Sequence, residues 1–208
     1  MSAVDFRLYL VTDRHQTAGR PLGSVLARAV RAGVRAIQLR ERDLPVRDLH
    51  ALATELQRDL PDARLFINDR VDVALALRTV GVHLRESSLP AGVARCLLGP
   101  SQLLGTSVHS LDGVIVAEQQ GADFVVLGPI YDTPSKRVYG PPLGMRILEQ
   151  AAQKVRIPIF AIGGITAART REVRQAGAFG VAVLSSILSA VNVEQATEEL
   201  LAAIQMES

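Results

Sequence analysis

The longest candidate loop of the sequence carries two hydroxyl groups and an ammonium group between prolines. It spans residues 127–144, LGPIYDTPSKRVYGPPLG, after a short apolar run. Thr133, Ser135 and Lys136 lie in its middle, and this combination of hydroxyls and a point charge suits an anionic phosphate. Lys136 is one of only 2 lysines among 23 basic residues, so we expect its compact charge to be needed there. The alternative is an ordinary solvated loop without a ligand.

Two short segments nearer the C-terminus offer a second place for a phosphate. Gly163 and Gly164 follow one apolar run, and Ser185 and Ser186 follow the next. Glycine lets backbone N–H groups approach a phosphate closely, and a helix beginning near Ser186 would add its own N-terminal N–H groups. Two glycines alone more often form a simple turn. Together with the two serines they favour a phosphate site.

His109, in the segment GTSVHS, is the best candidate for proton transfer, because imidazole titrates near neutral pH. Its alternative role is structural: Ser107 or Ser110 would cap the helix that follows, with His109 merely beside the cap. His83 lies inside an apolar run, where we expect a hydrogen-bonded structural role.

A further polar group follows the apolar run at residues 36–39. Gln38 and Arg40 are two residues apart, so we expect them to share the inward face of a strand, with Arg42 following at its exit. Arg40 could pair with the acidic neighbours around Glu41 or with an acidic substrate.

Asn68 and Asp69 end another apolar run and could hold a divalent metal. A single carboxylate is a poor magnesium site unless phosphate oxygens complete it. The alternative is that Asp69 simply caps the helix that follows.

All these residues follow short apolar runs that alternate with helical patterns. We expect eight strands, at residues 7–12, 36–39, 65–68, 81–84, 103–106, 124–127, 157–161 and 180–184. Glycines at positions 33, 121 and 177 mark helix ends. Eight parallel strands with crossover helices predict an α/β fold, a single (β/α)8 TIM barrel of minimal size over residues 1–208. An open doubly wound sheet is the alternative, but no glycine-rich nucleotide motif follows the first strand.

In such a barrel the active site lies at the C-terminal ends of the strands. Nearly every strand ends in polar or glycine residues while its interior is apolar, and this segregation indicates one shared site. The residues that we expect to line it are Gln38, Arg40, Arg42, Asn68, Asp69, Ser107, His109, Thr133, Ser135, Lys136, Gly163, Gly164, Ser185 and Ser186.

Composition excludes several other kinds of protein. The net charge is only +2 and the aromatic content 4%, with no basic run, so we expect no nucleic-acid partner. No apolar run approaches the roughly 20 residues of a membrane span, so we expect no membrane partner. We also expect no signal peptide, and therefore a cytoplasmic location. Cys96 is the only cysteine, which fits a reducing compartment, and we expect it to be an inert core or helix residue. A homo-oligomer is compatible with the sequence.

Several ordered segments extend across nearly the whole chain: LYLVTDR, IQLRER, INDRVDVAL, GVHL, GTSVHS, LGPIYDTPSK, FAIGGIT and GVAVLSSI. In this order they resemble the thiamin-phosphate synthase and thiazole tautomerase family. The resemblance implies a TIM-barrel enzyme of thiamin biosynthesis that acts on a small phosphorylated thiazole.

The synthase branch of that family joins hydroxymethylpyrimidine diphosphate to a thiazole phosphate, releases pyrophosphate and uses Mg²⁺. The resemblance assigns Asp69 to magnesium. It assigns the pyrimidine diphosphate to Gln38, Arg40, Asn68, Thr133, Ser135 and Lys136, and the thiazole phosphate to Gly164, Ser185 and Ser186. Where synthases commonly read GVHLGQED this chain reads GVHLRESS, so the second magnesium aspartate falls on Ser88. Their diphosphate lysine falls on Arg42. Glu86 could compensate for the lost carboxylate if the local backbone stays extended.

The tautomerase branch lacks the full metal site and isomerises a carboxylated thiazole phosphate without a cofactor. There His109 would be the acid–base group. Asp69 favours the synthase, whereas the missing carboxylate at Ser88 favours the tautomerase. On balance we expect the tautomerase, with the synthase as the alternative. A non-catalytic regulator that binds thiazole or thiamin phosphates, and another phosphate-binding barrel enzyme such as a sugar-phosphate epimerase, are further alternatives.

Overall fold

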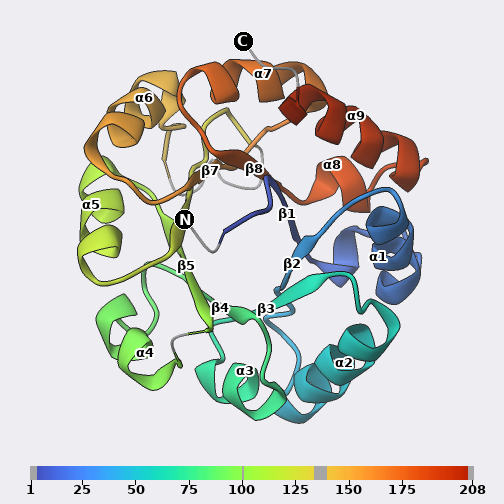
Figure 1. The fold of residues 1–208 in the computed structure, drawn as a ribbon. Coiled ribbons are helices and arrows are strands. Elements are labelled where there is room, and N and C mark those ends of the chain that lie inside the picture. The colour runs from blue at the N-terminus through green and yellow to red at the C-terminus, as the bar shows by residue number, and fades with distance from the viewer. Residues whose placement is uncertain (1–3, 100, 134–139, 206–208) are drawn as a thin grey trace.

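The chain forms a closed barrel of eight parallel strands surrounded by helices (Figure 1). The computed structural model describes residues 4–99, 101–133 and 140–205. The strands follow chain order around the barrel. They are β1 (Leu8–Val11), β2 (Ala36–Leu39), β3 (Arg64–Asn68), β4 (Gly81–Leu84), β5 (Leu103–Val108), β6 (Phe124–Leu127), β7 (Ile159–Ala161) and β8 (Gly180–Val183). The predicted minimal (β/α)8 barrel is therefore confirmed.

Helices follow the strands and cover the outside of the barrel (Figure 1). The predicted helix ends at positions 33, 121 and 177 are confirmed, because these glycines have φ of 112°, 83° and 97° just after helices. Within the described part of the chain no helix is both long and apolar enough to cross a membrane. The helices are η1 (Arg14–Gln16), α1 (Leu22–Arg31), α2 (Val46–Asp59), α3 (Val71–Leu77), α4 (Ala91–Leu97), α5 (Leu111–Gln119), α6 (Gly144–Lys154), α7 (Ala167–Gln175), α8 (Ser185–Leu188) and α9 (Val193–Gln205).

Two strands differ from the prediction by more than one residue at an end. Strand β7 begins later than predicted, because Pro158 has no N–H group to donate to a neighbouring strand. Strand β5 continues further, to Val108, because its last residues pair with β6. Ser107 is therefore a strand residue, and His109 follows the strand directly.

Aromatic rings fill the interior of the barrel near the start of the strands. Tyr9, Phe66, Phe124 and Phe160 are all fully buried, and the centroids of their contacting rings lie 5.4 to 6.0 Å apart. Phe6 precedes β1 and stacks on Phe160, with 5.3 Å between the ring centroids. Each such pair contributes about 0.5–1.5 kcal/mol beyond its burial. The filled interior leaves the C-terminal ends of the strands as the place for a site.

Candidate active site

A layer of polar side chains follows the aromatic rings inside the barrel, toward the C-terminal ends of the strands. Gln38, Asn68 and His83 are buried and Ser107 is half-buried. Gln38 Nε2 donates a hydrogen bond to Asn68 Oδ1 at 2.9 Å. Gln38 therefore points into the barrel, as its spacing predicted.

His83 has the structural role that we expected from the sequence. Its Nε2 lies 2.9 Å from Ser107 Oγ, which gives the buried ring a hydrogen-bond partner. Burial lowers the pKa of His83 to about 3, and the attraction of Asp69 does not restore it. The imidazole is therefore neutral at physiological pH and carries no charge into the site.

The carboxylate of Asp69 already accepts as many hydrogen bonds as its two oxygens can hold. Oδ1 accepts from the Arg85 backbone N–H at 3.0 Å and from the Ser88 hydroxyl. Oδ2 accepts from Asn68 Nδ2 at 3.1 Å and from Arg85 Nε. A carboxylate offers about four acceptor positions, so all are filled. Burial opposes ionisation, but the hydrogen bonds from Ser88 and Arg85 outweigh it, and the pKa of Asp69 lies below its ordinary value.

Asp69 does not cap the helix that follows it, contrary to the alternative considered above. The N-cap position of α3 is Arg70, and no side chain caps it. Asp69 instead has a left-handed backbone, with φ of 61°. For a residue other than glycine this conformation costs on the order of 1–3 kcal/mol, and the ion pair and hydrogen bonds of its carboxylate hold it there.

Arg85, directly after β4, uses only Nε of its guanidinium to bind Asp69. Its terminal nitrogens make no hydrogen bond with any residue that the structure describes, and 42% of its side chain is exposed. These nitrogens carry four of the five N–H donors of a guanidinium, so they are free to bind a ligand. Sequence reasoning missed Arg85, because only the fold brings the ends of β3 and β4 together.

Two more arginines, at and beyond the end of β2, have no partner among the described residues. Arg40 is half-buried and Arg42 is exposed, and neither guanidinium makes a hydrogen bond or ion pair there. Burial lowers the pKa of Arg40, and the like charges of Arg42 and Arg85 add to the effect, against the attraction of Asp13 and Glu41. Arg40 is thus an electrostatic neighbour of both Arg42 and Arg85, and we call these three residues the arginine cluster. Such a cluster suits an anion with several charged oxygens.

Glu41 explains why the guanidinium of Arg40 is free, because its carboxylate is already bound elsewhere. Its Oε1 accepts from Thr12 Oγ1 at 2.6 Å. Its Oε2 accepts from the backbone N–H of Arg14 at 3.1 Å and from Arg14 Nη1 at 3.2 Å. Thr12 Oγ1 also accepts from the Arg40 backbone N–H at 2.9 Å. The sequence suggested an ion pair between Arg40 and Glu41, and the structure does not have it. Instead, Thr12 contacts both Glu41 and the backbone N–H of Arg40, which fixes the backbone of Arg40.

The side chains that follow β3 and β4 do not form a magnesium site. No group of three His, Cys, Asp or Glu side chains in the described part of the chain could share a metal. Glu86 does not compensate for Ser88, because its Oε1 reaches toward Gly113 of α5, 3.0 Å from where a Cβ on that glycine would lie. A cation would have to displace Arg85 or Ser88 from Asp69. The residues present therefore do not fit the Mg²⁺ that the resemblance implies.

His109 is exposed at the end of β5 and is anchored to the next strand. Its Nδ1 is hydrogen-bonded to the carbonyl oxygen of Gly128, just after β6. A carbonyl only accepts, so Nδ1 is the donor of this hydrogen bond, and Nε2 is the ring nitrogen that remains for a substrate. The helix cap belongs to Ser110, whose Oγ accepts from the Gly113 N–H at 3.0 Å.

The loop that follows β6 lies partly outside the described residues. Ser135 and Lys136 belong to residues 134–139, which are not described. Thr133 is described, and its Oγ1 donates to the Tyr131 carbonyl at 3.0 Å. The Tyr131 hydroxyl donates to Glu172 Oε2 at 2.5 Å, which ties the start of the loop to α7.

The turns after β7 and β8 present backbone N–H groups without partners. Gly163 and Gly164 have φ of 95° and 68°, a conformation that favours glycine. Their N–H groups, and those of Ser185 and Ser186 at the start of α8, make no hydrogen bond with described residues. The Ser186 hydroxyl donates to the Ile165 carbonyl at 2.6 Å, which joins the two turns. The four N–H groups are therefore available to an anion, and the phosphate site at these turns stays a prediction.

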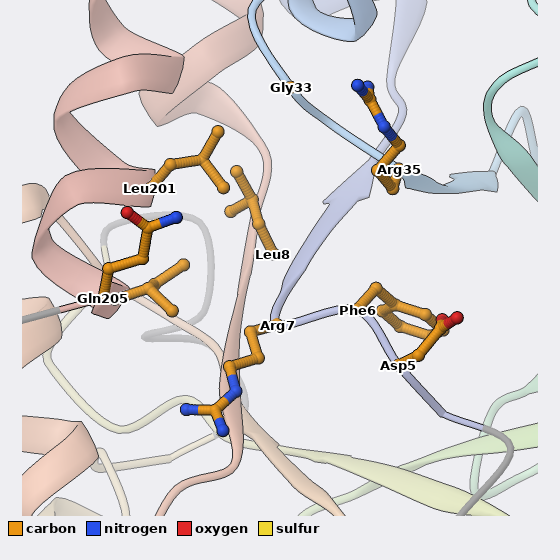
Figure 2. Close-up of a pocket in the computed structure, with 9 residues that line it drawn as sticks. Asp5, Phe6, Arg7, Leu8, Gly33, Arg35, Leu201 and Gln205 are labelled. Atoms are coloured by element: carbon orange, nitrogen blue, oxygen red, sulfur yellow. The ribbon is translucent and has the colours of Figure 1, made fainter. Parts of the chain in front are cut away.

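A pocket at the opposite end of the barrel is separate from these groups. It has a volume of about 430 Å³ and is lined by the segment before β1, the turn before β2 and the end of α9 (Figure 2). Figure 2 shows Arg7, Arg35 and Leu201 among its lining residues, and none of the predicted site residues. Because barrel enzymes place their chemistry at the C-terminal ends of the strands, we place the candidate site there.

The sequence is similar to known proteins over almost its full length. The family model described as thiamine monophosphate synthase matches residues 8–187. A putative thiamine-phosphate synthase of Geobacter sulfurreducens is 50% identical over 204 residues, which cover 97% of this chain and 96% of that protein. A thiamine-phosphate synthase of Roseiflexus sp. strain RS-1 is 42% identical over 199 residues, which cover 95% of this chain and 84% of that protein.

Solved structures agree with these sequence relatives. A thiamine phosphate pyrophosphorylase from Pyrococcus furiosus has a TM-score of 0.85 and 35% identity, over 96% of this chain and 95% of that chain. A 3-hexulose-6-phosphate synthase has a TM-score of 0.72 at 19% identity, over 96% of this chain and 100% of that chain, and this likeness shows the fold alone.

Proposed function

Because the chain belongs to the thiamine monophosphate synthase family, we propose that it is a thiamin-phosphate synthase, which joins hydroxymethylpyrimidine diphosphate to a thiazole phosphate and releases pyrophosphate. The protein is an enzyme of thiamin biosynthesis. Relatives at 50% and 42% identity bear the synthase name, which favours this reaction over the tautomerase that we expected from the sequence. That expectation relied on the missing carboxylate at Ser88. Arg85 brings positive charge to the same place, so the missing carboxylate no longer favours a tautomerase.

The observation that carries this proposal is the presence of two separate groups of anion-binding donors. The arginine cluster follows β2 and β4, whereas the free N–H groups follow β7 and β8, which are on the far side of β1 in the barrel. A synthase has two phosphorylated substrates, one of them a diphosphate, and needs both groups. A tautomerase substrate adds only a carboxylate to its one phosphate, and a single guanidinium can bind a carboxylate, so a cluster of three suits the diphosphate better.

The predicted site residues can then be assigned to the two substrates. Gln38, Asn68 and Ser107 lie in the interior layer beneath the arginine cluster, where a pyrimidine ring would enter. We propose that the arginine cluster binds the diphosphate, together with Thr133, Ser135 and Lys136 of the loop after β6. The thiazole phosphate would be bound by the backbone of Gly163, Gly164, Ser185 and Ser186.

The proposed reaction forms one bond and breaks one. The thiazole ring nitrogen donates its lone pair to the methylene carbon of the pyrimidine, and a C–N bond forms. The C–O bond to the diphosphate breaks, and its electron pair leaves with the pyrophosphate. Guanidinium groups stabilise the negative charge that develops on this leaving group. No proton moves in this step, so His109 would position substrate through its free Nε2 rather than act as an acid or base.

The tautomerase remains the second candidate, because the oriented Nε2 of His109 could also take a proton from a carboxylated thiazole phosphate. The test is to incubate the enzyme with both substrates and measure thiamin phosphate, and separately to measure isomerisation of the carboxythiazole phosphate. We expect thiamin phosphate, and the variant His109→Asn should retain its formation within about tenfold, since no proton transfer is lost.

Isomerisation without thiamin phosphate, with a loss of about a hundredfold or more in His109→Asn, would establish the tautomerase instead. Binding of thiazole phosphate without either product would favour a regulator. Turnover of a sugar phosphate would favour an epimerase.

A further inference from the structure

An ion pair stands at the place where the synthase pattern puts magnesium. Arg85 Nε and three hydrogen-bond donors fill the carboxylate of Asp69. Only 16% of the Asp69 side chain is exposed, against 42% for Arg85. An anion that reaches this end of the barrel therefore meets a guanidinium rather than a carboxylate.

The two residues that differ here from the synthase pattern, Arg85 and Ser88, both contact Asp69. In GVHLRESS, Arg85 stands where GVHLGQED has its second glycine, and Ser88 stands where that pattern has the second magnesium aspartate. Arg85 donates to Asp69 through its backbone and its side chain, and Ser88 donates through its hydroxyl. One change removes the negative charge of a metal ligand, and the other adds a positive group beside the remaining ligand. The two changes are therefore complementary.

We propose that Arg85 takes the place of the divalent cation, so that the arginine cluster binds the diphosphate substrate and the pyrophosphate product without magnesium. A guanidinium offers parallel N–H donors to phosphate oxygens and stays charged at physiological pH. Three guanidinium groups against the carboxylates of Asp69 and Asp13 leave an excess of positive charge for the leaving group, because Glu41 is already paired with Arg14. The role of Asp69 is then to position Arg85. This proposal rests on the synthase reaction proposed above.

The direct test is calorimetric titration of the full-length protein with inorganic pyrophosphate, once in excess EDTA and once in millimolar Mg²⁺. We expect binding in EDTA, with an affinity that Mg²⁺ changes by less than about threefold. The variant Arg85→Ala should weaken binding in EDTA by about tenfold or more, because a charged hydrogen-bond donor is lost. Binding by the wild-type protein only in the presence of Mg²⁺ would overturn the proposal.

Matched variants separate the ligand contact from charge and from folding. Arg156→Ala removes the same charge from an exposed position before β7, at the other end of the barrel, and should leave pyrophosphate affinity unchanged. Arg85→Lys keeps the charge but loses the paired donors, so it should fall between wild type and Arg85→Ala. Circular dichroism checks that each variant is folded. An affinity of folded Arg85→Ala equal to that of wild type would contradict the proposal.

Asp69→Asn distinguishes a metal ligand from a residue that positions Arg85. Both oxygens of Asp69 accept hydrogen bonds from Arg85, so an asparagine, which has one oxygen and one NH₂ group, keeps only one of these two contacts. We expect its pyrophosphate affinity in EDTA to fall by about threefold or more, because Arg85 is held less firmly in place. A Mg²⁺-dependent gain in wild-type affinity that Asp69→Asn abolishes would identify Asp69 as a metal ligand and overturn the proposal.

A parallel assay separates failure of this proposal from failure of the proposed function. Thiamin phosphate formation is measured with both substrates in EDTA and in Mg²⁺. Thiamin phosphate that forms at similar rates in EDTA and in Mg²⁺ supports both the synthase reaction and the role of Arg85. Formation only with Mg²⁺ retains the synthase and rejects the role of Arg85. Metal-independent pyrophosphate binding without any thiamin phosphate rejects the synthase, and with it the reaction on which the role of Arg85 rests.

Discussion

Gln38 of β2 donates a hydrogen bond of 2.9 Å to Asn68 of β3 inside the barrel. The same Asn68 donates from Nδ2 to Asp69 Oδ2 at 3.1 Å, so the amide of Asn68 is oriented from both sides. This connection runs from the buried interior of β2 to the ion pair of Asp69 with Arg85. The interior polar layer thereby supports the charged groups at the end of the barrel.

Asn68→Ala should destabilise the protein by about 1–3 kcal/mol, because it leaves the amide of Gln38 without its partner at a position that is only 3% exposed. Urea denaturation measures this loss. Gln195→Ala is the matched control: it removes an exposed amide that contacts Glu199 on α9, and should change stability by no more than about 0.5 kcal/mol. Equal losses in the two variants would mean that the interior hydrogen bond contributes nothing specific.

The stability of the protein should fall as the pH decreases below about 6.5, because of His83. Its pKa is lowered to about 3 from an ordinary value of 6.5, so between these values the unfolded chain binds a proton that the folded protein excludes. The stabilisation is fully present above pH 6.5 and is lost as the pH falls toward 3, by about 1.4 kcal/mol per pH unit. Urea midpoints between pH 7 and 5 measure it, above the range in which most carboxylates titrate. His83→Gln, which can still hydrogen-bond Ser107, should flatten this slope, and an unchanged slope would exclude His83 as its source.

The number and order of the strands could be predicted from the sequence, because each strand of this barrel is a short apolar run with a polar end. The predicted ends of two strands were wrong, because hydrogen bonding to neighbouring strands decides where β7 begins, after Pro158, and where β5 ends, at Val108. The inward face of Gln38 followed from alternation along one strand. The ion pair of Asp69 with Arg85 could not be predicted, because it joins the ends of two strands. Cys96, which we expected to be a core or a helix residue, lies in the helix α4 and is exposed.

Gly163→Ala should destabilise the protein and reduce its activity. A Cβ at this position would lie 2.5 Å from the Cβ of Pro129, and its φ of 95° strains any other residue. We expect a loss of about 1–3 kcal/mol in urea denaturation, together with a higher KM for the thiazole phosphate, because the turn that presents the N–H groups must shift. Gly23→Ala is the opposite control: nothing lies within 4 Å of its Cβ, and in the first turn of α1 alanine should add about 0.4–1 kcal/mol. A stable Gly163→Ala variant would mean that the turn adapts without cost.

Arg40→Ala should separate binding from stability more clearly than any other change at the site. The guanidinium of Arg40 has no partner among the described residues and is repelled by Arg42 and Arg85, so its loss leaves no buried group unpaired. Unfolding free energy should therefore stay within about 0.5 kcal/mol of wild type or rise. The KM for hydroxymethylpyrimidine diphosphate should increase by about tenfold to a hundredfold, as expected for a lost charged hydrogen bond to a phosphate. Added salt should raise the wild-type KM in the same direction by screening the arginine cluster. If Arg40→Ala instead lost stability and kept its KM, Arg40 would have a structural role, and the diphosphate would have to bind elsewhere.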